Sequence, residues 1–118
     1  MEVNFPKRGE IWLVSLEPVI GAEIGKARPA VVISNDRNNQ FAATVTVIPV
    51  TSKIERIYPF EVFLPAAETE LSRDSKAKCN QIRTIDKKRL VKSLGVLSLN
   101  KVRETEEALL VHLGIKVS

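Results

Sequence analysis

The sequence predicts a small, mainly β protein, built as a barrel or a sandwich of short strands and closed by one C-terminal helix. Its 118 residues, 44% of them hydrophobic, fit one compact domain with a modest core, and we expect that domain to span residues 1–118. About six short runs rich in β-branched, aromatic and aliphatic residues follow one another at close spacing, as in barrels and sandwiches. Only the last part of the chain repeats apolar residues at helical spacing.

The first strand is expected near the N-terminus. Residues 10–16 (EIWLVSL) form a short run of strand-forming residues, which Pro18 and Gly21 stop. From residue 17 to residue 28 the chain carries a second glycine, Gly25, among charged residues, and it is too polar for a core element. We therefore expect a mobile loop there.

Two further strands follow this loop. Residues 29–34 (PAVVIS) form a near-continuous apolar run, which is typical of a strand buried on both faces. Asn35, Asp36 and the asparagines after them are residues typical of a turn. Residues 44–50 (TVTVIPV) alternate threonine and valine at their start, which indicates the two-residue period of a strand.

The second half of the chain predicts three more strands and the helix. The strands are expected at residues 60–64 (FEVFL), 78–84 and 90–94, with a turn at residues 86–88 between the last two. The helix is indicated by apolar residues that fall on one face, with Ser98 or Asn100 to cap its start and Gly114 where it would end. These apolar residues are Val102, Leu109, Leu110 and Leu113.

The composition excludes several classes of protein. A single cysteine, Cys79, excludes an internal disulfide, and with a single histidine, His112, it leaves no Cys/His cluster for a metal ion. We expect neither a metal nor another cofactor. No run approaches the roughly 18 apolar residues of a membrane span, and residues 1–8 carry charges where a signal peptide needs an apolar run. These features favour a soluble, cytoplasmic protein.

The charge balance suits a polyanionic partner. Eighteen Lys and Arg against fourteen Asp and Glu give a net charge of +4, and the pI is about 9.4. Many basic proteins never bind nucleic acid, so the placement of these charges decides the interpretation. The densest basic run contains Lys87, Lys88, Arg89 and Lys92, and we interpret it first as a solvated turn and second as a phosphate contact.

Arg28 is the first candidate for chemistry on a polyanionic partner. If that partner is RNA, metal-free cleavage needs positive charge or donors at the crowded phosphorane and a route for the 2'-hydroxyl proton. His112 lies among helix leucines, and we interpret it as a packed residue. Arg28 stands at the start of a buried strand, where Pro29 favours an extended backbone, and its planar guanidinium matches two phosphate oxygens. From spacing alone, an ordinary strand-start arginine in a salt bridge is an equally good interpretation.

Thr51 is the second candidate. It ends the third strand directly before Ser52 and Lys53, so that two hydroxyls and an ammonium gather beside one strand end. Threonine is also simply common in strands, as Thr44 and Thr46 illustrate, and without other information that is the better interpretation. Only the position at the strand end distinguishes Thr51.

Four motifs carry a resemblance to a known family. They are RGEIWLV at residues 8–14, GAEIGKARPAVVISND at 21–36, VIPVTSKI at 47–54 and QIRTIDKKRL at 81–90. With a closing helix that ends in HLGI, their order and spacing over residues 7–115 are similar to the MazF/PemK (Kid) toxins of bacterial toxin–antitoxin modules. The chain departs from a common pattern at Asn80, where several relatives carry glutamate, and at Lys26, where some carry glycine. These departures bear on the recognised RNA sequence rather than on the chemistry.

The resemblance implies a fold, an activity and partners. The fold would be an SH3-like small β-barrel with a C-terminal helix, assembled as a homodimer. The activity would be sequence-specific, metal-independent cleavage of single-stranded RNA to 2',3'-cyclic phosphate and 5'-hydroxyl ends, by an endoribonuclease toxin that blocks translation. The partner would be an antitoxin whose acidic segment covers the RNA groove, with DNA bound only indirectly through that complex.

The resemblance also assigns roles to residues. The family's catalytic arginine falls on Arg28 and its catalytic threonine on Thr51. By the same matching, the expected contacts to RNA are Glu23, Ser52, Lys53, Ser75, Gln81 and Arg83.

Two other functions compete with this one. CcdB-type toxins share the barrel and the dimer but poison DNA gyrase without enzymatic activity, so that the fold alone does not separate the two. The pair of Arg28 and Thr51 discriminates, because a gyrase binder needs neither residue. A peptide-binding SH3-like adaptor would need an aromatic groove, and Trp12, Tyr58 and four phenylalanines are too few and too embedded in strands to supply one.

Overall fold

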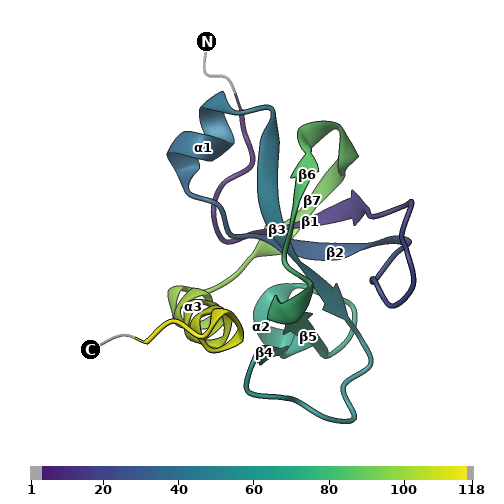
Figure 1. The fold of residues 1–118 in the computed structure, drawn as a ribbon, viewed down its shortest axis with the longest axis vertical. Coiled ribbons are helices and arrows are strands. Elements are labelled where there is room, and N and C mark those ends of the chain that lie inside the picture. The colour runs from purple at the N-terminus through teal and green to yellow at the C-terminus, as the bar shows by residue number, and fades with distance from the viewer. Residues whose placement is uncertain (1–3, 117–118) are drawn as a thin grey trace.

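A computed structural model describes residues 4–116, and Figure 1 shows the fold. Residues 1–3 and 117–118 of the expected domain lie outside the described residues. The elements are, in chain order, β1 (Glu10–Ser15), β2 (Ala27–Val32), α1 (Asp36–Phe41), β3 (Thr44–Thr51), β4 (Glu61–Leu64), α2 (Ala66–Thr69), β5 (Ser75–Lys78), the 3-10 turn η1 (Cys79–Gln81), β6 (Arg83–Asp86), the 3-10 turn η2 (Lys87–Arg89), β7 (Leu90–Val96) and α3 (Leu99–Leu113).

Over the described residues the strands form one antiparallel sheet in the order β4-β5-β3-β2-β1-β7, and β6 pairs with β3 beside β5. The long strand β3 belongs to both halves of the sheet, because it pairs with β6 at its start, with β2 in its middle and with β5 at its end. The sheet bends strongly around its core, but β4 and β7 stay as its edges, so strand pairing does not close it into a ring.

The centre of the sheet, at β2 and β3, is buried on both of its faces. Val31, Ile48 and Val50 contribute to one core cluster, while Val32 and Val47 contribute to the other. Neighbours along a strand point to opposite faces, so the near-continuous apolar runs of β2 and β3 supply both clusters at once. The expectation of a strand buried on both faces at residues 29–34 is confirmed for β2.

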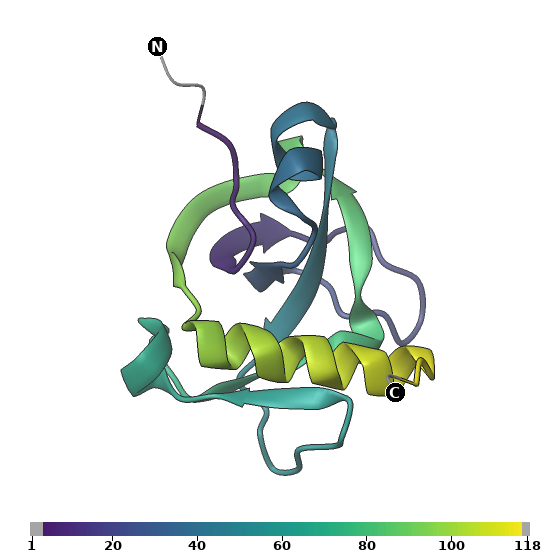
Figure 2. The same cartoon turned by 90° about the vertical axis from the view of Figure 1, so that its left-hand side faces the viewer.

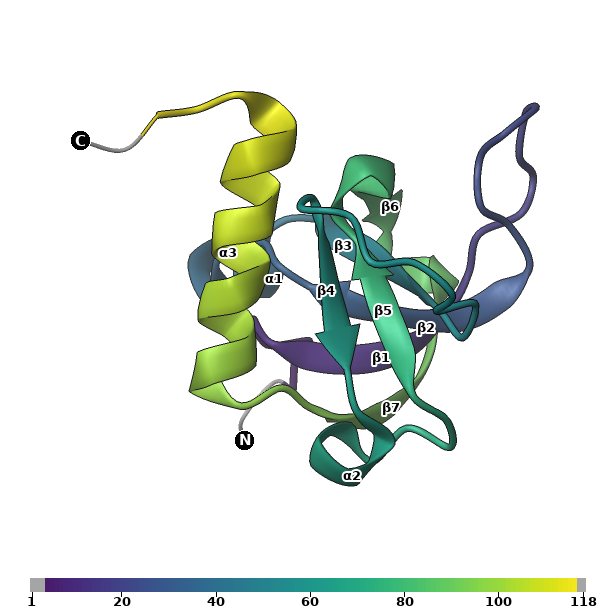
Figure 3. The same ribbon diagram turned by 90° about the horizontal axis from the view of Figure 1, so that it is seen from below.

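Helix α3 covers the first cluster. Its Ala108 is buried, and Val102 and Leu109 pack against the same cluster beside η1 and β4. Ser98 caps its start by accepting a hydrogen bond from the Lys101 N–H, as expected, and Gly114 ends it with a left-handed backbone. Figure 2 shows α3 running across the bent sheet, and in Figure 3 the loop between β1 and β2 projects from the opposite side.

Two of the expected elements are wrong in detail. The expected turn from Asn35 onward is the helix α1, which Asn35 caps through its side chain, so that turn-forming residues act here as helix-capping residues. The single strand expected at residues 78–84 is two strands, β5 and β6, which both run along β3. Between β5 and β6, Cys79–Gln81 form the 3-10 turn η1 and interrupt the pairing with β3. The local pattern of residues in the sequence does not reveal this interruption.

Candidate functional site

The site lies where β2 and β3 separate. They pair at Ala30↔Pro49, Val31↔Ile48 and Val32↔Val47. If the same register continued for two residues beyond the Ala30↔Pro49 pair, Arg28 would face Thr51. The ladder has ended there, and neither Pro29 nor Pro49 has an N–H to donate, while Val50 and Thr51 pair with β5 at the other edge of β3. Arg28 and Thr51 therefore stand opposite each other across an opening between two strands.

Three cavities run in series from this opening. The first, of about 290 Å³, and the second, also of about 290 Å³, share Arg28 and Thr51 in their walls. The second and the third, of about 340 Å³, share Ile24 and Gln81. We call the three cavities together the track. Arg28 and Thr51 form the junction between its first two parts.

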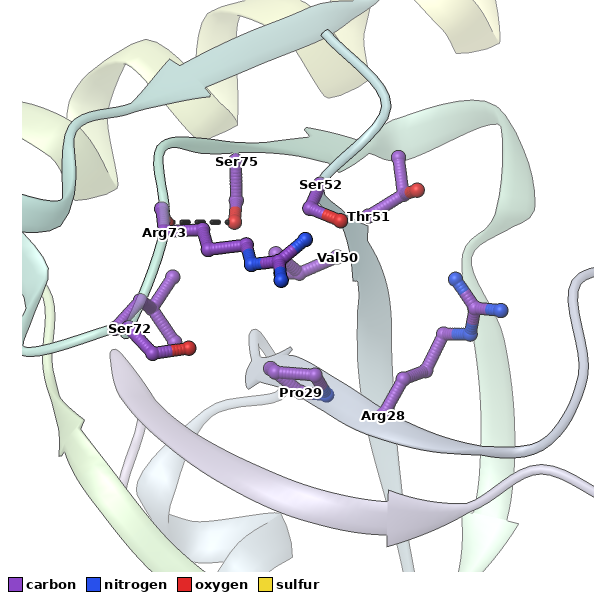
Figure 4. Close-up of a pocket in the computed structure, with 9 residues that line it drawn as sticks. Arg28, Pro29, Val50, Thr51, Ser52, Ser72, Arg73 and Ser75 are labelled. Carbon is purple, nitrogen blue, oxygen red and sulfur yellow. Dashed lines mark hydrogen bonds between the residues drawn. The ribbon is translucent and has the colours of Figure 1, made fainter.

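Arg28 and Thr51 are each held by one hydrogen bond that leaves donors free. The Arg28 Nε donates to the carbonyl oxygen of Gly25 at 2.7 Å, and the two terminal nitrogens of the guanidinium donate no hydrogen bond within residues 4–116. The Thr51 Oγ1 accepts the backbone N–H of Lys53 at 3.2 Å, so that its own hydrogen can be donated elsewhere. In Figure 4 the Arg28 guanidinium extends toward the side of the first cavity where Thr51 and Ser52 lie.

The other residues expected to contact RNA all line the track. Ser52 and Ser75 line the first cavity, Lys53 lines the second, and Gln81 lines the second and the third. Glu23 and Arg83 line the third cavity, away from Arg28. The structure thus brings the expected residues to one continuous surface, and their assigned roles stay predictions.

Several of these side chains form hydrogen bonds with backbone groups around the track. The Gln81 Oε1 accepts the backbone N–H of Ile24 at 3.3 Å, and Arg83 donates to the Leu16 carbonyl at 3.2 Å. Both bonds tie the loop between β1 and β2 to η1 and β6. The Ser75 Oγ donates to the carbonyl of Arg73 at 3.0 Å, the dashed line in Figure 4, and so fixes the turn before β5.

Three basic residues of the track were missed by sequence reasoning. Arg73 reaches into the first cavity in Figure 4, and Lys76 and Lys78 of β5 line the second. The signal for the lysines was present in the sequence SKAK, because residues two apart in a strand point to the same face. The strand expected there began only at residue 78, and this hid the pattern.

Lys76 and Lys78 share one buried carboxylate, that of Glu61. The Lys76 Nζ lies 2.9 Å from the Glu61 Oε1 and also donates to the Arg56 carbonyl at 2.7 Å, while the Lys78 Nζ lies 3.7 Å from the Glu61 Oε2. Burial raises the pKa of the Glu61 carboxyl, but the Tyr58 N–H and the two ammonium groups outweigh it and hold that pKa below its ordinary value of 4.5. Glu61 is therefore ionised at neutral pH.

The track is strongly basic. Six basic residues line it against two acidic ones, an excess of four charges that equals the net charge of the whole chain. The basic residues are Arg28, Lys53, Arg73, Lys76, Lys78 and Arg83, and the acidic ones are Glu23 and Glu55. Such a surface attracts a polyanion and holds it by its phosphates.

The chain matches a family model over nearly its whole length. The model describes PemK-like and MazF-like toxins of type II toxin–antitoxin systems, and the match spans residues 7–113, which includes both Arg28 and Thr51. The chain belongs to this family. The MazF-type family expected from the four sequence motifs is thereby confirmed.

Individual MazF proteins agree with this assignment. The chain is 46% identical to endoribonuclease MazF9 of Mycobacterium tuberculosis strain H37Rv over 114 residues, which cover 92% of this chain and 97% of that protein. The crystal structure of MazF (Form-I) from Deinococcus radiodurans is 29% identical and superimposes with a TM-score of 0.83, covering 95% of this chain and 99% of that one. The expected small, mainly β fold with a C-terminal helix is confirmed.

A further solved MazF structure contains the antitoxin. In the MazE–MazF crystal structure (Form-II) from Deinococcus radiodurans, the matched chain is 29% identical with a TM-score of 0.75, covering 94% of this chain and 97% of that one. This MazF-type chain thus shares its fold with a toxin that has been crystallised alone and together with MazE.

The cysteine and the histidine lie apart from this candidate site. Cys79 is fully buried, and burial together with the Glu61 charge raises the pKa of its thiol to about 12. His112 is exposed near the end of α3, against the ring of Phe60. Within residues 4–116, no three His, Cys, Asp or Glu side chains gather at a spacing that could hold a metal ion, and no helix is long and apolar enough to cross a membrane.

Proposed function

We propose that this chain, a MazF-family endoribonuclease toxin, cleaves single-stranded RNA within the track, with Arg28 and Thr51 at the scissile phosphate. The observation that carries the proposal is that Arg28 and Thr51 lie opposite each other at the junction of two cavities. Within residues 4–116, both side chains keep hydrogen-bond donors that have no partner. The family and the name of the M. tuberculosis relative support RNA cleavage, whereas nothing in them favours a gyrase poison.

In the proposed reaction the RNA supplies its own nucleophile. The 2'-hydroxyl oxygen attacks the adjacent phosphorus and gives up its proton to solvent water, and the 5'-oxygen leaves and takes up a proton from solvent water. The products are a 2',3'-cyclic phosphate and a 5'-hydroxyl. The phosphorane that forms between attack and departure carries more negative charge than the substrate. The enzyme accelerates the reaction by stabilising this charge.

Arg28 and Thr51 have distinct roles in this scheme. The free nitrogens of the Arg28 guanidinium bind the non-bridging oxygens and supply the positive charge that a metal ion supplies in other nucleases. The Thr51 hydroxyl, which accepts the Lys53 N–H, donates its own hydrogen to a non-bridging oxygen. An arginine side chain keeps its proton in proteins and is a poor base, so we assign Arg28 charge stabilisation.

The substrate is expected to be unpaired. Proteins that read RNA sequence generally splay bases out of single strands, because the A-form major groove is too narrow for side chains. The track offers cavities for such bases and few aromatic side chains to stack on them. Base reading therefore rests on polar side chains at the loop and at strand ends, such as Glu23, Ser52 and Gln81.

The first test is cleavage itself. Purified protein is incubated in EDTA with a long single-stranded RNA, and with the same RNA annealed to its complement, and the cut ends are mapped. We expect discrete cuts with cyclic phosphate ends in the single strand and protection in the duplex. Equal cutting of both forms would refute the single-strand proposal, and no cutting by folded protein would refute the endoribonuclease.

As a toxin of a type II family the chain has an antitoxin as its partner. We place an acidic antitoxin segment over the track, supported by the excess of basic residues there and by the MazE–MazF structure of the relative. Contact with DNA would then arise only through that complex. An antitoxin that binds the toxin and leaves cleavage unchanged would contradict this placement.

We further propose a homodimer and a cytoplasmic location, which family membership supports. The chain has a mass of 13.1 kDa, so sedimentation at the monomer mass across micromolar concentrations would contradict the dimer.

A further inference from the structure

The second cavity of the track contains an ammonium group, that of Lys78, whose charge is only partly compensated. Lys76 and Lys78 lie two residues apart on β5 and face the same side, and Lys78 stands directly opposite Glu61 of β4 in the register. One carboxylate thus serves two ammonium groups. The cluster of Glu61, Lys76 and Lys78 keeps one net positive charge at the wall of the cavity that Arg28 and Thr51 also line.

The surplus charge belongs to Lys78 and not to Lys76. The Lys76 ammonium is nearly enclosed, its side chain is 9% exposed, and it donates to both the Arg56 carbonyl and Glu61. The Lys78 side chain is 27% exposed, and its Nζ stands 3.7 Å from Glu61, which is beyond hydrogen-bond distance. Among residues 4–116 the structure shows no hydrogen bond from this Nζ, so its donors are open to the cavity.

The backbone of Lys78 is fixed in the sheet, while its ammonium group is open to the second cavity. Lys78 ends β5, which pairs with β4, and the Glu61 carboxylate draws the ammonium to one side of the cavity. Glu61 is itself held by the Tyr58 N–H at 3.0 Å and by Lys76. An ammonium positioned in this way loses little additional freedom when it binds a ligand, which favours binding.

We propose that Lys78, positioned by Glu61, binds a backbone phosphate of the RNA next to the one that is cleaved. This inference rests on the proposed function, which places single-stranded RNA in the track. A lysine ammonium is a point charge without the planar fork that reads a base edge, so it suits a phosphate. Lys78 thereby adds to RNA affinity without contributing to sequence preference.

Salt dependence of binding distinguishes a phosphate contact from other roles. Each phosphate neutralised on a single strand contributes about 0.7 to the slope of log affinity against log salt. Lys78→Met should lower the magnitude of that slope by about 0.7, which corresponds to roughly a five-fold loss of affinity at 0.1 M salt if the affinities converge near 1 M. Lys78→Arg keeps the charge and should retain the wild-type slope.

The measurement is fluorescence anisotropy of the full chain with a single-stranded RNA that carries a 2'-deoxy sugar at the mapped cleavage position, in KCl from 50 to 400 mM. Lys78→Gln is measured beside Lys78→Met, so that the result does not depend on the folding of one variant. Lys116→Met is the matched control, because it removes the same charge from an exposed residue beyond α3, outside the track. It should leave the slope unchanged.

The outcomes separate the possibilities. A lower slope in the two neutral variants, with the same cleavage sites on a long RNA, supports the phosphate contact. A wild-type slope in both neutral variants, or an equal fall in Lys116→Met, overturns it, and altered cleavage sites would overturn it in favour of base reading. Wild-type protein that neither binds nor cleaves the single strand would instead refute the proposed function.

Discussion

Replacing Glu61 by glutamine tests the charge cluster beneath the second cavity. The Glu61 side chain is 1% exposed, and the Lys76 side chain, 9% exposed, has its ammonium 2.9 Å from the Glu61 carboxylate. Glutamine keeps the size of the side chain and can still accept the Tyr58 N–H, but it leaves the Lys76 charge buried without a counter-charge. Removal of one partner from a buried ion pair costs about 3–5 kcal/mol. For a chain of this size, at about 4 °C per kcal/mol, the midpoint of thermal unfolding should fall by about 12–20 °C.

A second ion pair of the same chain is the control. Lys101 and Glu104 of α3 lie 3.1 Å apart, but the Glu104 side chain is 41% exposed. Water replaces the lost partner there, so Glu104→Gln should cost no more than about 1 kcal/mol. Urea unfolding followed by circular dichroism gives both free energies. Equal losses in the two variants would refute the argument that burial makes the Glu61 pair costly to break.

The same variant has a defined pH dependence. The pKa of Glu61 is lower in the folded chain than its ordinary value of 4.5, so the unfolded chain binds more protons as the pH falls. The stabilisation by Glu61 is therefore fully present above about pH 5 and is lost as the pH falls through the folded pKa. The stability difference between wild type and Glu61→Gln should be constant from about pH 6 to 8 and should shrink in acid. A difference that grows in acid would contradict the assignment.

Three further predictions concern the site and the fold. Thr51→Val removes the hydroxyl at nearly constant shape and should lower the cleavage rate by about 10²–10³, while Thr51→Ser should keep most of the wild-type rate. Near-wild-type cleavage by the valine variant would exclude the role given to Thr51. Cys79, fully buried with a thiol pKa of about 12, should resist alkylation at pH 8 until the chain is unfolded in urea, and rapid labelling of native protein would contradict that burial. Asn35→Ala removes the cap of α1 and should cost about 1 kcal/mol in urea unfolding, whereas an unchanged midpoint would show that the cap is dispensable.

The residues at the strand separation could be found from sequence because their signals are local. Arg28 precedes a proline at the start of an apolar run, and Thr51 ends an alternating run, so both positions follow from the order of residues along one segment. Their interpretation as a catalytic pair needed the family resemblance, because spacing alone left ordinary structural roles open. The register of β2 and β3 supplies the physical connection that the sequence lacks, since it places the two residues opposite each other.

The charge cluster could not be found in this way because it depends on distant partners. Glu61 lies in an apolar strand, and Lys76 lies fifteen residues away in a segment that contains two charged residues among four. Only the pairing of β4 with β5 shows that these charges bury one another. The helix α1 was missed for a different reason, since asparagine and aspartate are as common at helix caps as in turns, and the outcome depends on the residues that follow.

The single-turnover cleavage rate of Arg28→Gln in EDTA tests the central claim most directly. Excess enzyme and a mapped single-stranded RNA separate the chemical step from binding, and Arg103→Gln, on the exposed surface of α3, controls for loss of one positive charge. We expect the Arg28 variant to be slower than wild type by at least about 10²–10³, while the Arg103 variant cleaves as wild type does. A folded Arg28→Gln that cleaves within a factor of about ten of the wild-type rate would contradict the assignment of Arg28 to the scissile phosphate.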